Sequence, residues 1–167
     1  MSISQQHIDY LEKWCDKKID RIIYDSDVDG ENKDIFKERI AGRKDLYFLN
    51  IKGDLIYGGF TYKEPTFDGL QNGDEDCFIF TFNENGQKQH YNKYPSHKRC
   101  VQDCGICLPS DNFYFFYWAF GIVKLNSGNW CHDGLDNYHF EGSFPQCLIG
   151  DIQNPFSVDR VIVIQMK

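Results

Sequence analysis

The chain has 167 residues, of which 41% are hydrophobic and 16% aromatic. This length is typical of one domain whose core is large enough to need no metal or disulfide for stability. The net charge is −7, from 25 acidic and 18 basic residues. Proteins that are held on nucleic acid by phosphate contacts usually carry the opposite balance, so the charge argues against that class.

The sequence contains no segment typical of export or membrane insertion. Residues 1–7 are polar and lack the apolar region of a secretory signal. The longest apolar run, residues 113–123, is shorter than the roughly 20 residues that a membrane-spanning helix needs. Seven cysteines, an odd number, are typical of reduced thiols. We therefore expect an intracellular, cytoplasmic protein without a transmembrane segment.

Residues 1–19 are predicted to form an amphipathic helix that packs on the domain. Ser2 and Gln5 have the spacing of a capping box. Apolar residues then recur at helical spacing, at Ile8, Leu11, Cys15 and Ile19. The alternative is the end of a partner-binding or coiled-coil segment, but the apolar stripe is too short for a free-standing coiled coil.

A short strand at residues 21–24 is predicted to run into an acidic turn. Asp25, Asp27 and Asp29 occupy the first, third and fifth positions of a possible EF-hand calcium loop. The twelfth position, which needs a bidentate glutamate, holds Phe36 instead. The alternative is an Asx-rich turn that ends a strand and starts a helix, and the missing ligand favours it.

The next elements are a helix and two hairpins. The helix is expected from Asn32 to Ala41, and a hairpin follows with arms at residues 46–51 and 55–57. Gly58-Gly59 should interrupt the second arm, where an aromatic side chain lies against the main chain. The second hairpin is predicted over residues 77–91, with its turn at Asn85-Gly86.

The remaining segments alternate between loops and buried strands. Residues 64–76 are predicted to form an exposed acidic loop, and residues 126–144 a long irregular connection. Residues 113–123 should form one buried strand that is broken near Gly121. The apolar run 161–164 predicts a last strand inside a sheet, because it would aggregate if exposed.

These elements predict a mainly β (α+β) fold. About two helices and roughly seven strands with short turns favour a sandwich of two antiparallel sheets with a few peripheral helices. The sandwich domain is expected to span residues 20–167, with the helix of residues 1–19 packed against it.

Cys100, Cys104 and Cys107 are the most conspicuous candidate ligands. Their spacing matches the cysteines that hold the iron–sulfur cluster of radical S-adenosylmethionine enzymes, but the βα alternation of those enzymes is missing. Zinc bound by the three cysteines with His97 or His132 is chemically reasonable, because thiolates and imidazole suit a tetrahedral site. The third interpretation, reduced cysteines in a turn-rich loop, is favoured because a zinc knuckle normally offers two separated pairs.

No catalytic motif stands out in the sequence. Cys131, His132 and Asp133 have the residue types of a thiol-based triad, but adjacent residues cannot meet in that geometry. Nucleophile elbows, phosphate-binding loops and dinucleotide motifs are missing as well. We therefore expect a protein that is not an enzyme and has no cofactor.

The order and spacing of many short patterns resemble the TLDc domain, the family of the oxidation-resistance proteins, over residues 20–167. The matching patterns are Ile22-Ile23-Tyr24, Asp29-Gly30, Leu46-Tyr47-Phe48, Gly58-Gly59-Phe60, Cys77-Phe78-Ile79-Phe80, Tyr94-Pro95, Trp118-Ala119-Phe120-Gly121 and the segment 156–163. The resemblance implies two packed antiparallel sheets, protection from oxidative damage, binding to the vacuolar proton-pumping ATPase, and no established catalysis. Many members carry glutamates in the last strand, where this chain has Arg160 and Ile162.

Three functions follow from these observations. The leading hypothesis is a non-catalytic TLDc-like protein-interaction domain that serves in oxidative-stress protection, with vacuolar ATPase subunits as partners. The second is a redox or zinc sensor that uses the cysteines of residues 100–107. The third is a regulatory nucleic-acid-binding protein, which the net charge disfavours. Its local basic face would comprise Lys88, Lys93, Lys98 and Arg99.

Overall fold

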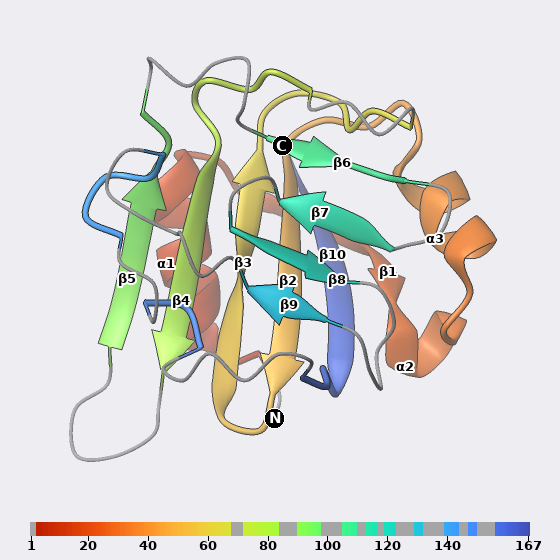
Figure 1. Cartoon of the computed structure of the whole chain (residues 1–167), viewed down its shortest axis with the longest axis horizontal. Coiled ribbons are helices and arrows are strands. Elements are labelled where there is room, and N and C mark those ends of the chain that lie inside the picture. The colour runs from red at the N-terminus through yellow and green to blue at the C-terminus, as the bar shows by residue number, and fades with distance from the viewer. Residues whose placement is uncertain are drawn as a thin grey trace.

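The computed structural model shows two β-sheets flanked by helices (Figure 1). It describes residues 3–67, 72–83, 90–97, 105–109, 113–116, 119–122, 129–131, 139–143, 147–149 and 156–167. Within these ranges the chain forms a six-stranded sheet, a four-stranded sheet and three helices. The predicted class, mainly β with two antiparallel sheets and few helices, is confirmed.

The larger sheet is the central layer of the molecule. Its strand order is β1-β10-β2-β3-β4-β5, and all neighbouring strands are antiparallel. Its strands are β1 (Ile19–Asp25), β2 (Leu46–Lys52), β3 (Leu55–Thr61), β4 (Phe78–Asn83), β5 (His90–Pro95) and β10 (Arg160–Met166). The predicted last strand, β10, lies between β1 and β2, and its residues 161–164 are buried on both faces of the sheet.

Two glycines in β3 allow close packing on both sides of the strand. The strand is continuous through Gly58 and Gly59, so the predicted interruption is wrong. The predicted aromatic neighbour is present at Gly59, where a Cβ would collide with the ring of Phe116 in the second sheet. At Gly58 a Cβ would collide with the backbone carbonyl of Phe48. Because glycine has no Cβ, a neighbouring strand and an aromatic ring can lie close to β3 at these two positions.

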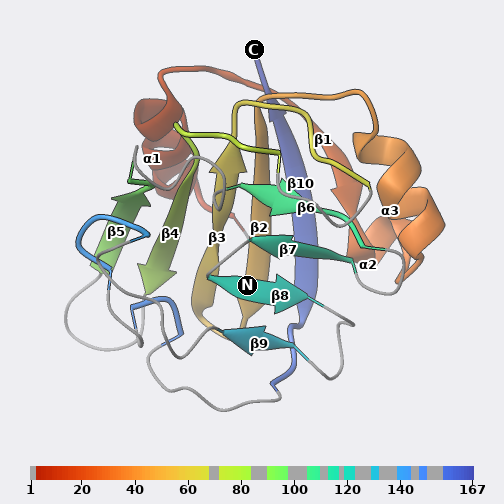
Figure 2. The ribbon, with the colours of Figure 1, turned by 45° about the horizontal axis from the view of Figure 1, so that its top comes forward.

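The smaller sheet packs over one face of the larger one, in front of β2, β3 and β10 (Figures 1 and 2). Its strands, in spatial order, are β6 (Ile106–Cys107), β7 (Tyr114–Phe116), β8 (Phe120–Ile122) and β9 (Trp130–Cys131). The single strand predicted over residues 113–123 is wrong, because β7 and β8 form an antiparallel pair. Ala119 N donates to Phe116 O at 3.0 Å where the chain reverses, and Gly121 lies inside β8.

Aromatic side chains fill the space between the two sheets. Phe36 meets Tyr24 and Phe113 edge to face, with ring centroids 4.9 and 5.2 Å apart. Tyr57 and Phe120 are arranged in the same way at 5.4 Å. Edge-to-face contacts of this kind add stability beyond that of the buried area. The core between the sheets is therefore an interlocked set of rings.

Helix α1 (Gln5–Cys15) covers the opposite face of the large sheet, behind β4 and β5 in Figure 1. Its N-cap is Ser4, which forms a capping box with His7 at 3.2 and 3.3 Å. The box predicted at Ser2 is therefore wrong, because His7 fills the role expected of Gln5. The helix also ends at Cys15, before the predicted residue 19, because the backbone of Asp16 is left-handed.

The last turn of α1 is attached to the sheet by side-chain donors. Tyr47 Oη donates to Leu11 O at 2.8 Å, Lys93 Nζ to Trp14 O at 2.6 Å, and Tyr62 Oη to Cys15 O at 3.4 Å. The last carbonyls of a helix have no partner within it. The bonds to Trp14 O and Cys15 O therefore satisfy two carbonyls of the helix end, and all three bonds fix its position. Leu11 and Cys15 of this helix are buried in the core on this face of the large sheet.

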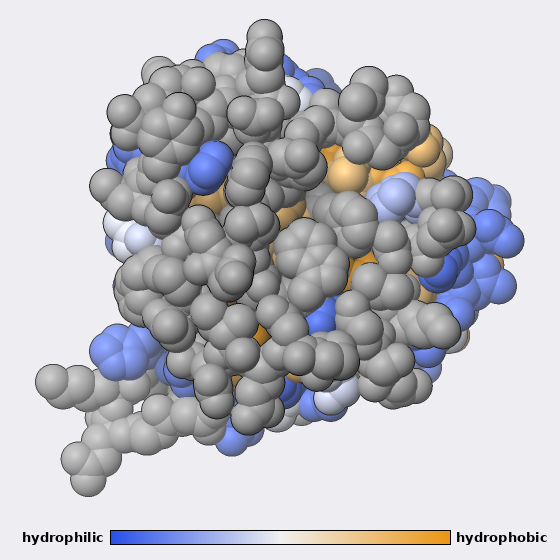
Figure 3. Space-filling view, in the orientation of Figure 1, coloured by the Kyte–Doolittle hydropathy of each residue, from blue (hydrophilic) through white to orange (hydrophobic). Residues whose placement is uncertain are grey.

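Two helices close the sandwich beside β1. They are α2 (Ser26–Asp29) and α3 (Lys33–Ile40), and Asn32 caps α3 as predicted. Phe36 and Ile40 are buried between the sheets, and the outer side of α3 forms part of the hydrophilic edge at the right of Figure 3. None of the described helices has the length and apolar character of a membrane-spanning helix.

Candidate functional site

The acidic turn after β1 faces an arginine. Asp25 ends β1 and caps α2, since its side chain accepts a hydrogen bond from Asp27 N at 3.1 Å. Arg160 of β10 donates to both carboxylate oxygens of Asp25 at 2.8 and 2.5 Å, and its Nε lies 3.1 Å from Asp27 Oδ2. Hydrogen bonds from Arg160 hold the pKa of the Asp25 carboxyl below its ordinary value.

This geometry has consequences for the calcium hypothesis. Asp29 accepts from Asp25 N at 2.9 Å and pairs with Arg39 at 3.4 Å, so all three aspartates are engaged with protein donors. Phe36, at the position of the bidentate ligand, is buried in the core. The turn ends a strand and begins a helix, as the alternative interpretation predicted. Arg160 places one positive charge against Asp25 and Asp27 of this turn.

The described residues contain no group of three or more His, Cys, Asp or Glu side chains placed to hold a metal ion. Cys100, Cys104 and His132 lie outside the described residues. Cys107 is buried in β6, with 2% of its surface exposed, and His97 follows β5. The zinc and redox hypotheses for this cluster therefore stay predictions.

The predicted basic face is described at one position only. Lys88, Lys98 and Arg99 lie outside the described residues. Lys93 points toward α1, where its Nζ donates to Trp14 O and lies 4.2 Å from the centroid of the Phe78 ring. Burial lowers the pKa of Lys93. This lysine is therefore used to hold the helix, and the nucleic-acid hypothesis stays a prediction.

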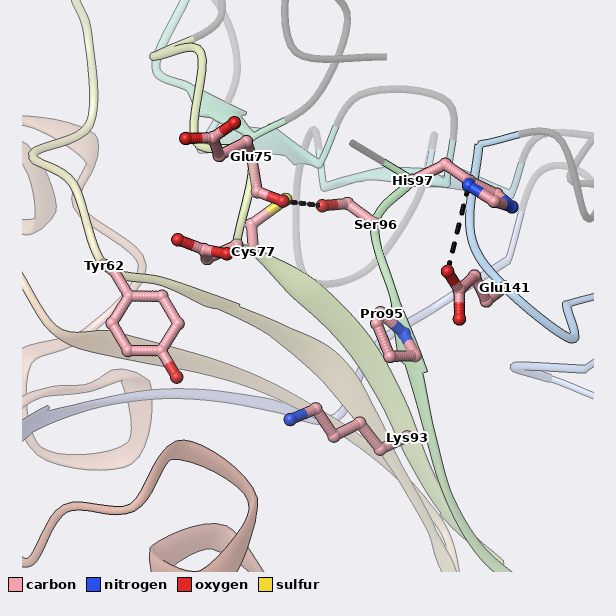
Figure 4. A pocket seen from close by; sticks show the side chains of 9 residues that line it. Tyr62, Glu75, Cys77, Lys93, Pro95, Ser96, His97 and Glu141 are labelled. Carbon is pink, nitrogen blue, oxygen red and sulfur yellow. Dashed lines mark hydrogen bonds and ion pairs between the residues drawn. The ribbon is translucent and has the colours of Figure 1, made fainter. Parts of the chain in front are cut away.

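A groove of about 620 Å³ lies where β3 ends, β4 begins and β5 ends (Figure 4). Its lining combines carboxylates, two basic side chains and a phenol: Tyr62, Glu75, Asp76, Cys77, Lys93, Pro95, Ser96, His97 and Glu141. We take this groove as the candidate functional site.

A buried aspartate shapes one wall of the groove. Asp74 is 1% exposed, and its carboxylate accepts hydrogen bonds from Thr61 Oγ1 at 2.7 Å, from Tyr62 N and from Lys63 N at 3.2 Å. The prediction that residues 64–76 form an exposed loop is therefore wrong at this residue. Fixing Asp74 holds the neighbouring residues 75 and 76 at the end of β3, where their side chains are exposed.

The other wall is a short segment that is joined to the sheet edge by an isolated β-bridge between Ser96 and Phe140. Residues 139–141 run along the outer edge of β5, where Glu141 N donates to Pro95 O at 2.8 Å and His97 N donates to His139 O at 2.9 Å. This pairing brings the Glu141 carboxylate within 3.8 Å of His97 Nδ1, as Figure 4 shows. The groove is therefore lined by three carboxylates and two basic groups.

A comparison of the chain with models of known protein families found no match, and a comparison with curated proteins found none either.

Sequence reasoning identified His97 as a candidate ligand and Lys93 as part of a basic face, and it assigned no site role to the other residues of the groove. Glu141 and Ser96 come from segments that meet only through the pairing of Ser96 with Phe140. The sequence around residue 141 is rich in turn-forming residues and carries no strand pattern. The one local signal was the acidic composition of residues 64–76, which includes Glu75 and Asp76.

Chemically, the groove suits the binding of polar groups. Glu75, Asp76 and Glu141 are exposed carboxylates. Cys77, whose thiol is a possible nucleophile, is fully buried. Lys93 is already bonded to α1. The arrangement thus offers acceptors for a positively charged group that approaches from solvent.

Proposed function

We propose that this chain is a non-catalytic protein-interaction domain of the TLDc type, which acts in the cytoplasm. Its partner is a subunit of the vacuolar proton-pumping ATPase, and the binding contributes to protection from oxidative stress. The patterns shared with the TLDc family support this proposal. The fold class supports it too, because a sandwich of antiparallel sheets with peripheral helices is what the resemblance implies.

The observation that carries the proposal is that the buried apolar side chains of the described residues pack into cores, whereas the groove is lined by charged groups. These apolar side chains form two cores, one between the sheets and one beneath α1. The groove at the end of β5 is open and lined by charged groups. Ligand and active sites are usually enclosed, largely apolar cavities with a few convergent polar groups. An open, charged groove on a rigid sheet is better suited to contacts with another protein.

Affinity purification tests the proposal. A tagged copy of the chain is expressed in cells under normal and peroxide-stressed conditions, and bound proteins are identified by mass spectrometry. We expect vacuolar ATPase subunits to be enriched over a tag-only control. Recovery of an unrelated complex alone would remove the ATPase as the partner.

A surface variant locates the binding face in the same experiment. Glu75→Lys with Asp76→Lys reverses two exposed charges of the groove without changing either core. If the groove is the binding surface, this variant recovers less of the partner than the unchanged chain does. Equal recovery would place the interaction on another face.

A further inference from the structure

The two edges of the large sheet differ in regularity. β1 has register shifts between Ile19 and Arg21 and between Ile22 and Tyr24. β5 pairs with β4 without a shift, from His90 opposite Asn83 to Pro95 opposite Phe78. Bulges hinder the addition of another strand to an edge. The outer edge of β5 is therefore the better template for strand addition.

The hydrogen-bond pattern shows which backbone groups face outward on β5. Ser96 N donates to Cys77 O at 2.9 Å, so Ser96 faces β4. Because bonded and non-bonded residues alternate along an antiparallel ladder, the peptide groups of Tyr94 face β4 and those of Lys93 face away from it. The outward peptide groups of Lys93 have no backbone partner among the residues that the structure describes.

The chain already pairs with this edge beside Lys93, through an isolated β-bridge between Ser96 and Phe140. Residues 139–141 pair with the edge at Pro95 and His97. The chain then turns away, because Gly142 has a φ of +75° and Ser143 N donates to Phe140 O at 3.1 Å. The bridged segment thus stops before it reaches Lys93.

The charges beside this edge select the partner. Glu75, Asp76 and Glu141 line the groove next to Lys93, and all three side chains are exposed. Among described residues, His97 pairs with Glu141, and no ion pair is formed by Glu75 or Asp76. The net charge of −7 adds to the attraction of a cation over longer range.

We infer that the outer edge of β5 at Lys93, together with the groove, binds an extended basic segment of a partner protein as an additional strand. Backbone bonds to Lys93 align the segment. A lysine or arginine side chain then reaches the carboxylates of Glu75, Asp76 and Glu141. The inference rests on the proposed function and names the surface and the partner chemistry through which the domain would act.

Three peptides serve as probes for the unchanged chain. The first is a fluorescent peptide of alternating lysine and valine, the second has glutamate in place of lysine, and the third is the lysine peptide with N-methyl groups on the amides of one edge. We expect the first to bind and the other two to bind at least about tenfold more weakly by fluorescence anisotropy. Hydrogen exchange of the Lys93 amide should slow when the first peptide binds.

Two variants of one residue separate the backbone from the side chain. Lys93→Ala and Lys93→Pro both lose the bond to Trp14 O, but only proline removes the outward N–H. We expect Lys93→Pro to bind the lysine peptide about tenfold more weakly than Lys93→Ala does. If Lys93→Pro fails to fold, the N-methylated peptide tests the same bond on the unchanged chain.

The outcomes separate this inference from the proposed function. Absence of binding, equal binding of the glutamate peptide, or protection at sites away from Lys93 would each overturn the edge inference. Recovery of ATPase subunits would still support the proposed function in those cases. Slowed exchange at Lys93 without ATPase recovery would support the edge inference and remove the ATPase assignment.

Discussion

Replacing Gly59 with alanine tests how closely the two sheets pack. The new Cβ would collide with three ring atoms of Phe116, so the ring would have to retreat by about 1 Å to reach an ordinary carbon–carbon separation. Phe116 is fully buried and stacked on Phe120, with centroids 5.7 Å apart, which restricts that movement. Overpacking of this kind costs about 1–3 kcal/mol of unfolding free energy.

Urea unfolding followed by fluorescence measures this cost, as a lower midpoint with an unchanged slope. The same substitution is then made in a Phe116→Leu background, where the smaller side chain leaves room for the Cβ. We expect the cost of Gly59→Ala to fall below about 1 kcal/mol there, which a double-mutant cycle detects as coupling.

Gly53→Ala is the matched control for this cycle. Gly53 has a φ of +57°, and no described atom lies within 4 Å of the place that a Cβ would occupy, so alanine costs conformational strain alone, about 1 kcal/mol. That cost should be equal in both backgrounds. If Gly59→Ala behaves in the same way as Gly53→Ala, the argument that Phe116 packs on Gly59 is refuted.

Further predictions on three variants concern charge, titration and helix docking. Arg160→Met should lower the unfolding free energy at neutral pH by about 1.5–3 kcal/mol, because it leaves the Asp25 carboxylate without its charged donor. Because the pKa of Asp25 is low in the folded state, this carboxyl contributes stability above the ordinary aspartate pKa, and that stability is lost as the pH falls through the folded-state value. In a pH series of urea melts, the unfolding free energy should therefore fall less steeply below about pH 4 in Arg160→Met than in the unchanged chain. Burial raises the pKa of Tyr62 to about 12, so the stability that this phenol contributes is lost as the pH rises above the ordinary tyrosine value of about 10. The unfolding free energy should therefore fall less steeply with alkaline pH in Tyr62→Phe than in the unchanged chain. An equal slope would contradict the raised pKa of Tyr62. Leu11→Ala should cost about 2–5 kcal/mol and speed alkylation of the buried Cys15 thiol, measured by mass spectrometry, whereas unchanged alkylation would show that α1 stays docked.

The elements that were predicted correctly are those with a complete local signal. The hairpin of β2 and β3 has apolar arms and a glycine in its turn, and the Asn32 cap is followed at once by the donors that it binds. The buried run of residues 161–164 predicted a strand inside a sheet, because its apolar residues have no polar alternation. In these segments, neighbouring residues alone determine the local structure.

The errors occur where distant residues decide the conformation. Residues 113–123 are apolar throughout, so nothing in their composition marks the reversal at Ala119 that separates β7 from β8. Asp74 looks like an exposed acid until Thr61 and the following amides are found to bind it. The groove depends on the pairing of residues 96 and 140, which no local pattern encodes.

The position of β10 has a consequence for folding during synthesis on the ribosome. Asp25 and Arg160 are 135 residues apart, yet the strands that contain them are neighbours. β1 and β2 are therefore synthesised long before the strand that joins them, and each exposes an open edge until it arrives. Nascent chains that end before Arg160 should need chaperones that shield strand edges, and joining β1 to the sheet should be a late, slow step.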